Sequence, residues 1–186
     1  QEGQTVFNDI TQGINNCGAG HDVSDLNCCD TGYGAVAGFD PATGTLYMAI
    51  SQIGKALTRA DPRYDLGGPD HIGLTENLCG GILAFNTEAQ VSDTAGGLID
   101  SPNVAVGASF VVKGQPEGEG CAVDGIANPD NIAVLPGANL LMIAEDTSRH
   151  AYDALWAYHL DTGELVRVLT APWASEVTGI QWTPDL

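Results

Sequence analysis

Short apolar runs separated by turn residues fill most of the chain from residue 35 onward. Alternating or fully apolar stretches predict strands over residues 35–40, 45–51, 79–85, 104–113, 140–144, 155–160 and 165–169. No stretch longer than about ten residues repeats its apolar positions with the period of an amphipathic helix. The pattern therefore predicts an all-β protein.

Two of the predicted strand pairs share one turn pattern. Residues 40–44 read Asp-Pro-Ala-Thr-Gly, and residues 161–163 read Asp-Thr-Gly. Proline presets φ and glycine accepts a positive φ, so both stretches predict tight turns between antiparallel strands. The same strand–turn–strand unit, repeated more than 100 residues apart, is typical of propeller blades. We therefore expect a partial or complete β-propeller-like array of antiparallel blades with long irregular loops.

Two segments fall outside this regular pattern. Residues 1–34 are rich in glycine and cysteine and have no period, which predicts an irregular segment ahead of a β domain at 35–186. Residues 52–78 form a long polar excursion, and loops of that length are usually functional or disordered. Arg59 and Arg63 lie in it. They either pair with neighbouring aspartates on a helical turn or contact an anionic substrate.

The charge balance excludes several classes of partner. The net charge of −18 comes from 24 acidic and only 6 basic residues, so phosphate backbones and anionic membranes would repel the chain. No apolar run approaches the roughly 18 residues that a membrane span needs. The acidity suits either a solvating surface or carboxylates gathered around cations. Five cysteines favour an oxidising, extracytoplasmic compartment: secreted, periplasmic or an organelle lumen.

The stretch 125–147 carries the candidate chemistry. Asp130 and Asn131 lie at the start of one predicted strand, and Glu145 and Asp146 follow the end of its hairpin partner. Antiparallel pairing brings those two positions to the same edge of a sheet, where their oxygens can hold a hard cation. Alternatively, Asp130 and Asn131 only cap an Asx turn, and Arg149 neutralises the carboxylate pair.

The same stretch resembles a known family. Residues 126–137, with Asn-Pro-Asp-Asn-Ile-Ala-Val-Leu-Pro-Gly, and residues 141–147, Leu-Met-Ile-Ala-Glu-Asp-Thr, resemble the C-terminal half of the PhoX-like alkaline phosphatase family. The blocks 46–51, 76–82, 153–165 and 176–180 are similar to the same family. The resemblance covers roughly residues 43–185.

This resemblance implies a propeller that binds calcium together with iron and hydrolyses small phosphate monoesters in extracytoplasmic space. The metals would neutralise the phosphate and activate the attacking oxygen. Asp130, Asn131, Glu145 and Asp146 match its metal-binding positions, and Glu176 is a fifth candidate. The catalytic residues stay unassigned.

The resemblance also bears on the cysteines and on the extent of the chain. Cys79 and Cys121 flank two matched blocks and are the favoured disulfide, with Cys17 and Cys28 or Cys29 next. The Cys-Glu-Glu-like iron motif of the family is absent, and a full propeller of this family needs about twice this length. We therefore expect a fragment, a processed product or a shortened relative, completed by a second chain or by a larger complex. The alternative function is a non-catalytic propeller-like subunit, stabilised by calcium or disulfides, in an extracytoplasmic or lumenal assembly.

Overall fold

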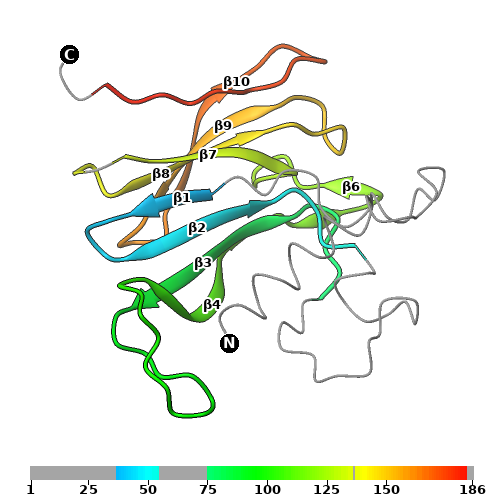
Figure 1. Cartoon of the computed structure of the whole chain (residues 1–186). Coiled ribbons are helices and arrows are strands. Elements are labelled where there is room, and N and C mark those ends of the chain that lie inside the picture. Colours follow the sequence, from blue (N-terminus) through cyan, green and yellow to red (C-terminus); the bar gives the residue numbers. More distant parts are fainter. Residues whose placement is uncertain (1–36, 55–74, 136, 184–186) are drawn as a thin grey trace, which may run out of the picture.

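The computed structural model describes residues 37–54, 75–135 and 137–183 (Figure 1). Strands and turns without a helix make up these ranges, which confirms the all-β prediction. The described residues thus contain no helix that is long and apolar enough to cross a membrane. The strands are β1 (Ala37–Asp40), β2 (Thr45–Ile50), β3 (Gly81–Glu88), β4 (Val104–Lys113), β5 (Pro116–Glu117), β6 (Gly120–Cys121), β7 (Pro129–Leu135), β8 (Leu140–Glu145), β9 (Ala154–His159) and β10 (Leu165–Thr170).

Eight of these strands form two antiparallel meanders. The first sheet has the order β1-β2-β3-β4, and the second has the order β10-β9-β8-β7. Strands β5 and β6 form a separate two-stranded ribbon that the sequence did not predict. The antiparallel sheets confirm the coarser prediction, and the reading of each meander as a propeller blade stays a prediction. The described residues do not close into a propeller, so a complete ring stays a prediction.

The two predicted turns have the expected conformation. Gly44 has a φ of +66° and Gly163 one of +72°, both in the left-handed region that glycine tolerates. The Asp40 side chain closes the first turn by accepting hydrogen bonds from the backbone N–H of Ala42 (3.0 Å) and the hydroxyl of Thr43 (2.7 Å). Such side-chain capping is the reason aspartate is favoured where a turn begins.

The core lies between the two sheets. Figure 1 shows β7 beside β1 at the boundary, and β7 contacts both β1 and β2. Side chains at alternate strand positions fill the boundary, because successive residues of a strand face opposite ways. They are Tyr47, Ala49, Ile82, Ala84, Ile132, Leu141, Ile143, Ala154 and Trp156, and Ile126, from the segment before β7, joins them. Tyr158 packs against this cluster, so Trp156 and Tyr158 share one inward face as their spacing predicts.

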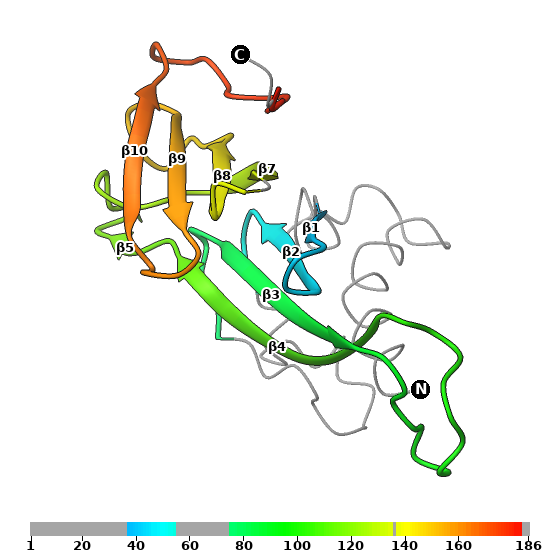
Figure 2. The same cartoon turned by 90° about the vertical axis from the view of Figure 1, so that its left-hand side faces the viewer.

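Strands β2 and β3 are buried on both faces. Met48, Ile50, Leu83 and Phe85 form a second cluster on the side of the first sheet that faces away from the second. Burial on both sides explains why the two strands read as continuous apolar runs rather than alternating ones. Figure 2 shows the far ends of β3 and β4 extending beyond the second sheet. The middle of β4 is accordingly exposed.

A disulfide joins the residues just before β3 to strand β6. Cys79 and Cys121, 42 residues apart, are bonded, which confirms the favoured pairing. Both cysteines are buried with Ala127. A side chain at Gly114 would approach the Cβ of Cys79 to 2.5 Å, so only glycine fits where the chain passes the disulfide. Cys17 and Cys28, and the whole 1–34 segment, lie outside the described residues.

Candidate functional site

Glu145 and Asp146 leave the end of β8 in opposite directions. Glu145 has the same parity as Leu141 and Ile143 and is fully buried with them. Asp146, one residue later, is exposed. The pair therefore does not act as a unit, and each carboxylate needs its own account.

Three donors surround the carboxylate of Glu145. Its Oε1 accepts hydrogen bonds from the backbone N–H of Ala127 (2.8 Å) and from Nε1 of Trp156 (2.7 Å). Its Oε2 accepts one from the backbone N–H of Ala154 (2.8 Å). Burial raises the pKa of Glu145 from its usual 4.5 to about 7, and these hydrogen bonds prevent a larger rise while the charge of Asp153 adds to it.

His150 is the fourth neighbour of this carboxylate. Its Nε2 lies 3.6 Å from Oε2 of Glu145, and only 1% of its side chain is exposed. Neither ring nitrogen makes a well-formed hydrogen bond within the described structure. Burial lowers the pKa of His150, and the charge of Arg167 lowers it further, whereas the backbone of Tyr152 and the charge of Asp153 oppose this. The His150 side chain thus lies buried beside Glu145.

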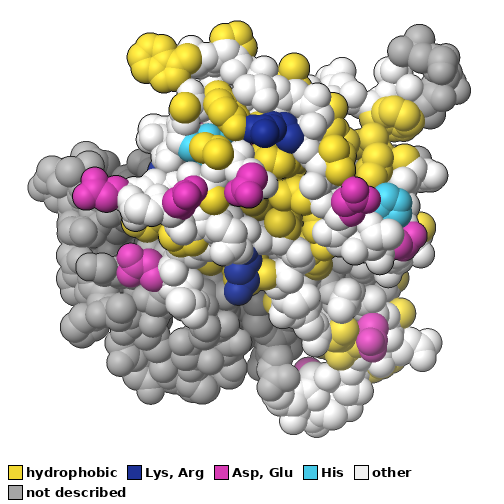
Figure 3. All heavy atoms as spheres, turned by 180° about the vertical axis from the view of Figure 1, so that it is seen from behind, with side chains coloured by type: hydrophobic (Ala, Val, Ile, Leu, Met, Phe, Trp, Pro, Cys, Tyr) yellow, Lys and Arg dark blue, Asp and Glu magenta, His cyan; other side chains and the backbone are white. Residues whose placement is uncertain are grey.

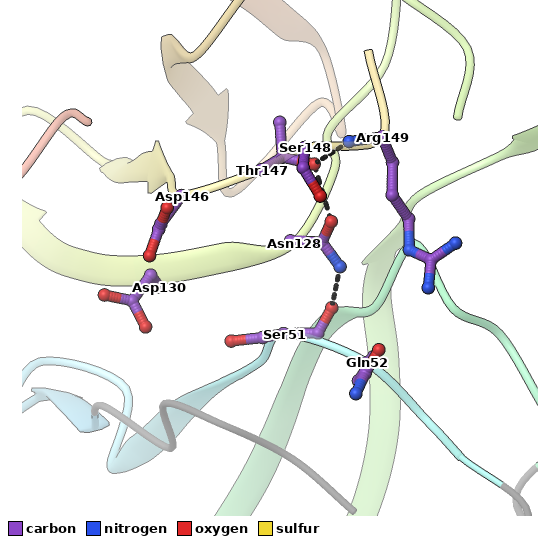
Figure 4. A pocket seen from close by; sticks show the side chains of 8 residues that line it. All are labelled: Ser51, Gln52, Asn128, Asp130, Asp146, Thr147, Ser148 and Arg149. Atoms are coloured by element: carbon purple, nitrogen blue, oxygen red, sulfur yellow. Dashed lines mark hydrogen bonds between the residues drawn. The ribbon is translucent and has the colours of Figure 1, made fainter. Parts of the chain in front are cut away.

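Asp146 faces a pocket of about 330 Å³ at the boundary between the sheets (Figure 4). Three chain segments build it: the residues after β2, the start of β7 and the residues after β8. The lining side chains are Ser51, Gln52, Asn128, Asp130, Asp146, Thr147, Ser148 and Arg149. The sequence predicted that Asp130 and Asp146 would lie at one edge, and both line this pocket.

A β-bulge brings Asp130 to the pocket. Pro129 pairs with Glu145, but Asn131 pairs with Ala144, so Asp130 is an extra residue without a partner across the ladder. Such a residue is turned out of the regular alternation, and bulges are common beside functional sites because they redirect a side chain. The side-chain amide of Asn131 donates a hydrogen bond to Asp130 Oδ2 (2.9 Å).

The pocket acids repel each other. Burial raises the pKa of Asp130, and so does the negative charge of Asp146, while the Asn131 amide lowers it. The pKa of Glu176 is raised by loss of hydration and by the charges of Asp146, Asp130 and Asp153. Figure 4 shows the Asp146 side chain pointing toward Asp130. A cation at this end of the pocket would relieve the repulsion.

Asn128 holds the three segments together and was not singled out by the sequence. Its side-chain amide donates to the backbone oxygens of Ser51 (2.7 Å) and Leu78 (2.9 Å), and its Oδ1 accepts from the hydroxyl of Thr147 (2.6 Å). Its φ is +43°, a conformation that asparagine tolerates better than most residues. The sequence feature that could have indicated this role is an asparagine directly before the Pro-Asp turn.

The donors of the pocket fit calcium better than iron. Carboxylate, hydroxyl and amide oxygens are the ligands of a hard cation such as Ca²⁺. The two described cysteines are bonded to each other, and His150 faces Glu145, so the pocket has no sulfur or imidazole ligand for iron. In the described ranges no three His, Cys, Asp or Glu side chains converge closely enough to hold a metal by themselves. Calcium here would need hydroxyl, backbone, water or ligand oxygens as well.

The predictions for the three arginines have different outcomes. Arg59 and Arg63 lie outside the described residues, so their contact with a substrate stays a prediction. Arg149 was considered as the ionic partner of Glu145 and Asp146, but within the described structure it forms an ion pair with neither. Its guanidinium lies at the opposite side of the pocket from Asp130 and Asp146 (Figure 4).

Comparisons with protein-family models, with curated proteins and with solved structures found no match.

Proposed function

We propose that this chain supplies the calcium-binding part of a phosphomonoesterase of the PhoX-like kind. One observation carries the proposal: Asp130 and Asp146, two of the positions that the family resemblance assigns to metal, line one pocket, and their charges repel. Glu176 is close enough for its pKa to respond to both. Asp130 and Asp146 are therefore the candidates for holding the cation, with hydroxyl, backbone, water or ligand oxygens completing its coordination.

The net charge of the chain makes a cation necessary for this chemistry. At −18, the protein repels a phosphate ester, and the pocket acids add to the repulsion locally. Bound calcium would neutralise the phosphate and act as a Lewis acid on its oxygens. Asp130 and Asp146 would hold the cation, and Asn128 keeps the segments that bear them in place through its hydrogen bonds to Ser51 and Thr147.

Calcium titration calorimetry, combined with release of inorganic phosphate from glycerol phosphate and phenyl phosphate, tests this function. We expect Asp130→Asn and Asp146→Asn each to weaken calcium binding at least about tenfold, equivalent to about 1.4 kcal/mol, and to reduce phosphate release. Asp161→Asn removes the same charge from an exposed turn and serves as the matched control. Calcium binding that is indifferent to both pocket aspartates would refute the proposal.

A second function is favoured by the position of Glu145. The three hydrogen bonds of this residue serve the core, which leaves fewer acids for a metal centre than the resemblance implies. A non-catalytic propeller-like subunit, held together by calcium and by the Cys79–Cys121 disulfide, needs no more than this. Calcium binding without release of phosphate from any ester would select this function.

Both functions share an extracytoplasmic location and a partner. The disulfide suits an oxidising compartment. Strand β10 lies at the edge of its sheet and exposes Val166, Val168 and Leu169, and hydrophobic side chains gather in the middle of the face in Figure 3. Unpaired strand edges invite pairing with another chain. We propose that further blades, from a second chain or the rest of the same protein, cover this edge.

A further inference from the structure

The acids occupy only one side of the pocket. Arg149 lines the other side, on the same side as Gln52 in Figure 4. The pocket is therefore bipolar, with carboxylates at one end and a guanidinium at the other.

The backbone of Arg149 is held firmly. Its N–H donates to the hydroxyl of Thr147 (3.0 Å), and its carbonyl accepts from the N–H of Cys121 (3.0 Å), a disulfide-bonded residue. A side chain at Gly120 would come within 2.2 Å of the Arg149 carbonyl oxygen, so only glycine allows this close approach. A fixed backbone reduces the entropy that is lost when the guanidinium engages a ligand.

The remainder of the lining has an unusual composition. Ligand pockets are mostly lined by apolar and aromatic side chains, with a few polar groups that orient the ligand. Here all eight lining residues are polar or charged. An aryl group would find only the carbon atoms of polar side chains to pack against, whereas the exposed Ser148 hydroxyl could pair with a hydroxyl group of a ligand. The volume of about 330 Å³ suits a small ligand.

We infer that Arg149 binds the phosphate of a small phosphate monoester whose alcohol part carries several hydroxyl groups. This inference rests on the proposed function and specifies its substrate class. The guanidinium offers paired N–H donors that match phosphate oxygens. The polar surface of the lining, including the exposed Ser148 hydroxyl, receives the alcohol.

The test measures binding by calorimetry in the presence of calcium, with glycerol 1-phosphate as the probe and phenyl phosphate as the comparator of equal charge. We expect glycerol phosphate to bind at least about tenfold more tightly. Arg149→Met should weaken its binding about 10- to 100-fold and leave calcium affinity unchanged. Arg149→Lys keeps the positive charge but lacks the paired N–H donors of the guanidinium, so it should bind glycerol phosphate more tightly than Arg149→Met and less tightly than the wild type.

Arg167→Met is the matched control. Arg167 is exposed on β10 and stacks over Tyr152 and Trp156, away from the pocket lining. Its replacement should leave the affinity for glycerol phosphate unchanged, and urea unfolding of each variant would show that the fold is intact.

The outcomes separate this inference from the proposed function. Equal or tighter binding of phenyl phosphate, or binding by Arg149→Met at wild-type strength, overturns the inference even if calcium binds and esters are hydrolysed. Absence of glycerol phosphate binding also overturns it. If neither calcium binding nor hydrolysis occurs, the proposed function fails, whereas Arg149-dependent binding of glycerol phosphate would still uphold the inference.

Discussion

Removing the carboxylate of Glu145 tests the account of the core most directly. Glu145→Ala would leave three buried donors without an acceptor: the N–H groups of Ala127 and Ala154 and the indole N–H of Trp156. An unsatisfied buried donor costs about 1–3 kcal/mol. At the lower half of that range, about 1–2 kcal/mol each, three donors cost about 3–6 kcal/mol. This is a large part of the roughly 5–15 kcal/mol that stabilises a typical domain.

The stability lost on replacing Glu145 should depend on pH, and the raised pKa of Glu145 determines at which pH the loss is larger. Because the folded-state pKa of Glu145 is about 7 and its usual value is 4.5, the folded state holds the proton more tightly. The stability from this group is therefore fully present below 4.5 and is lost as the pH rises through about 7. Linkage between these values makes the wild type about 2 kcal/mol more stable from this source at about pH 5.5 than at about pH 8.

Urea unfolding at these two pH values measures both effects. Glu145→Ala should lose more stability at about pH 5.5 than at about pH 8, because the mutant lacks the group that binds the proton. Glu88→Ala is the control, since Glu88 also ends a strand but is exposed; it should change the free energy of unfolding by less than about 0.5 kcal/mol. A loss below about 1 kcal/mol for Glu145→Ala at both pH values would contradict the proposed hydrogen-bonding role.

Two further predictions concern the disulfide and the acidic end of the pocket. Replacing Cys79 and Cys121 by serine opens a loop of 42 residues and should lower the free energy of unfolding by up to about 4 kcal/mol. Denaturant titration with and without reductant measures this loss. An unchanged midpoint would show that the bond does not constrain the unfolded chain. Asp146→Asn should lower the pKa of Asp130, because it removes a repelling charge. A titration of the Asp130 carboxylate followed by NMR measures this pKa. An unchanged value would place the two groups too far apart to share a cation.

Much of the strand order could be predicted because local chemistry marks it. The Asp40–Gly44 turn combines proline, a capping aspartate and a glycine at positive φ, so both flanking strands were found. Strands β5 and β6 were missed because two residues are too few to show a period of two. How the two sheets pack against each other depends on contacts far apart in the sequence, such as those of β7 with β1 and β2, which hydrophobic patterns do not encode.

The site was predicted in position but not in detail. Antiparallel register was enough to bring Asp130 and Asp146 to one edge, although the bulge that frees Asp130 from the ladder has no sequence marker. The burial of Glu145 did have a sequence marker. Leu141, Ile143 and Glu145 occupy alternate positions of one strand and so face the same side, and the first two are core residues. Treating Glu145 and Asp146 as a pair hid this signal.

The buried glutamate also explains how the pocket keeps its shape. Glu145 binds Ala127, just before the Asn128 turn, and Ala154, just after the segment that carries Asp146 and Arg149. It thereby fixes one side of both pocket segments to the end of β8. Asn128 then joins these segments across the pocket itself. Loss of Glu145 should therefore disturb ligand binding without any contact to the ligand, which makes it a positioning residue for the pocket and not a member of it.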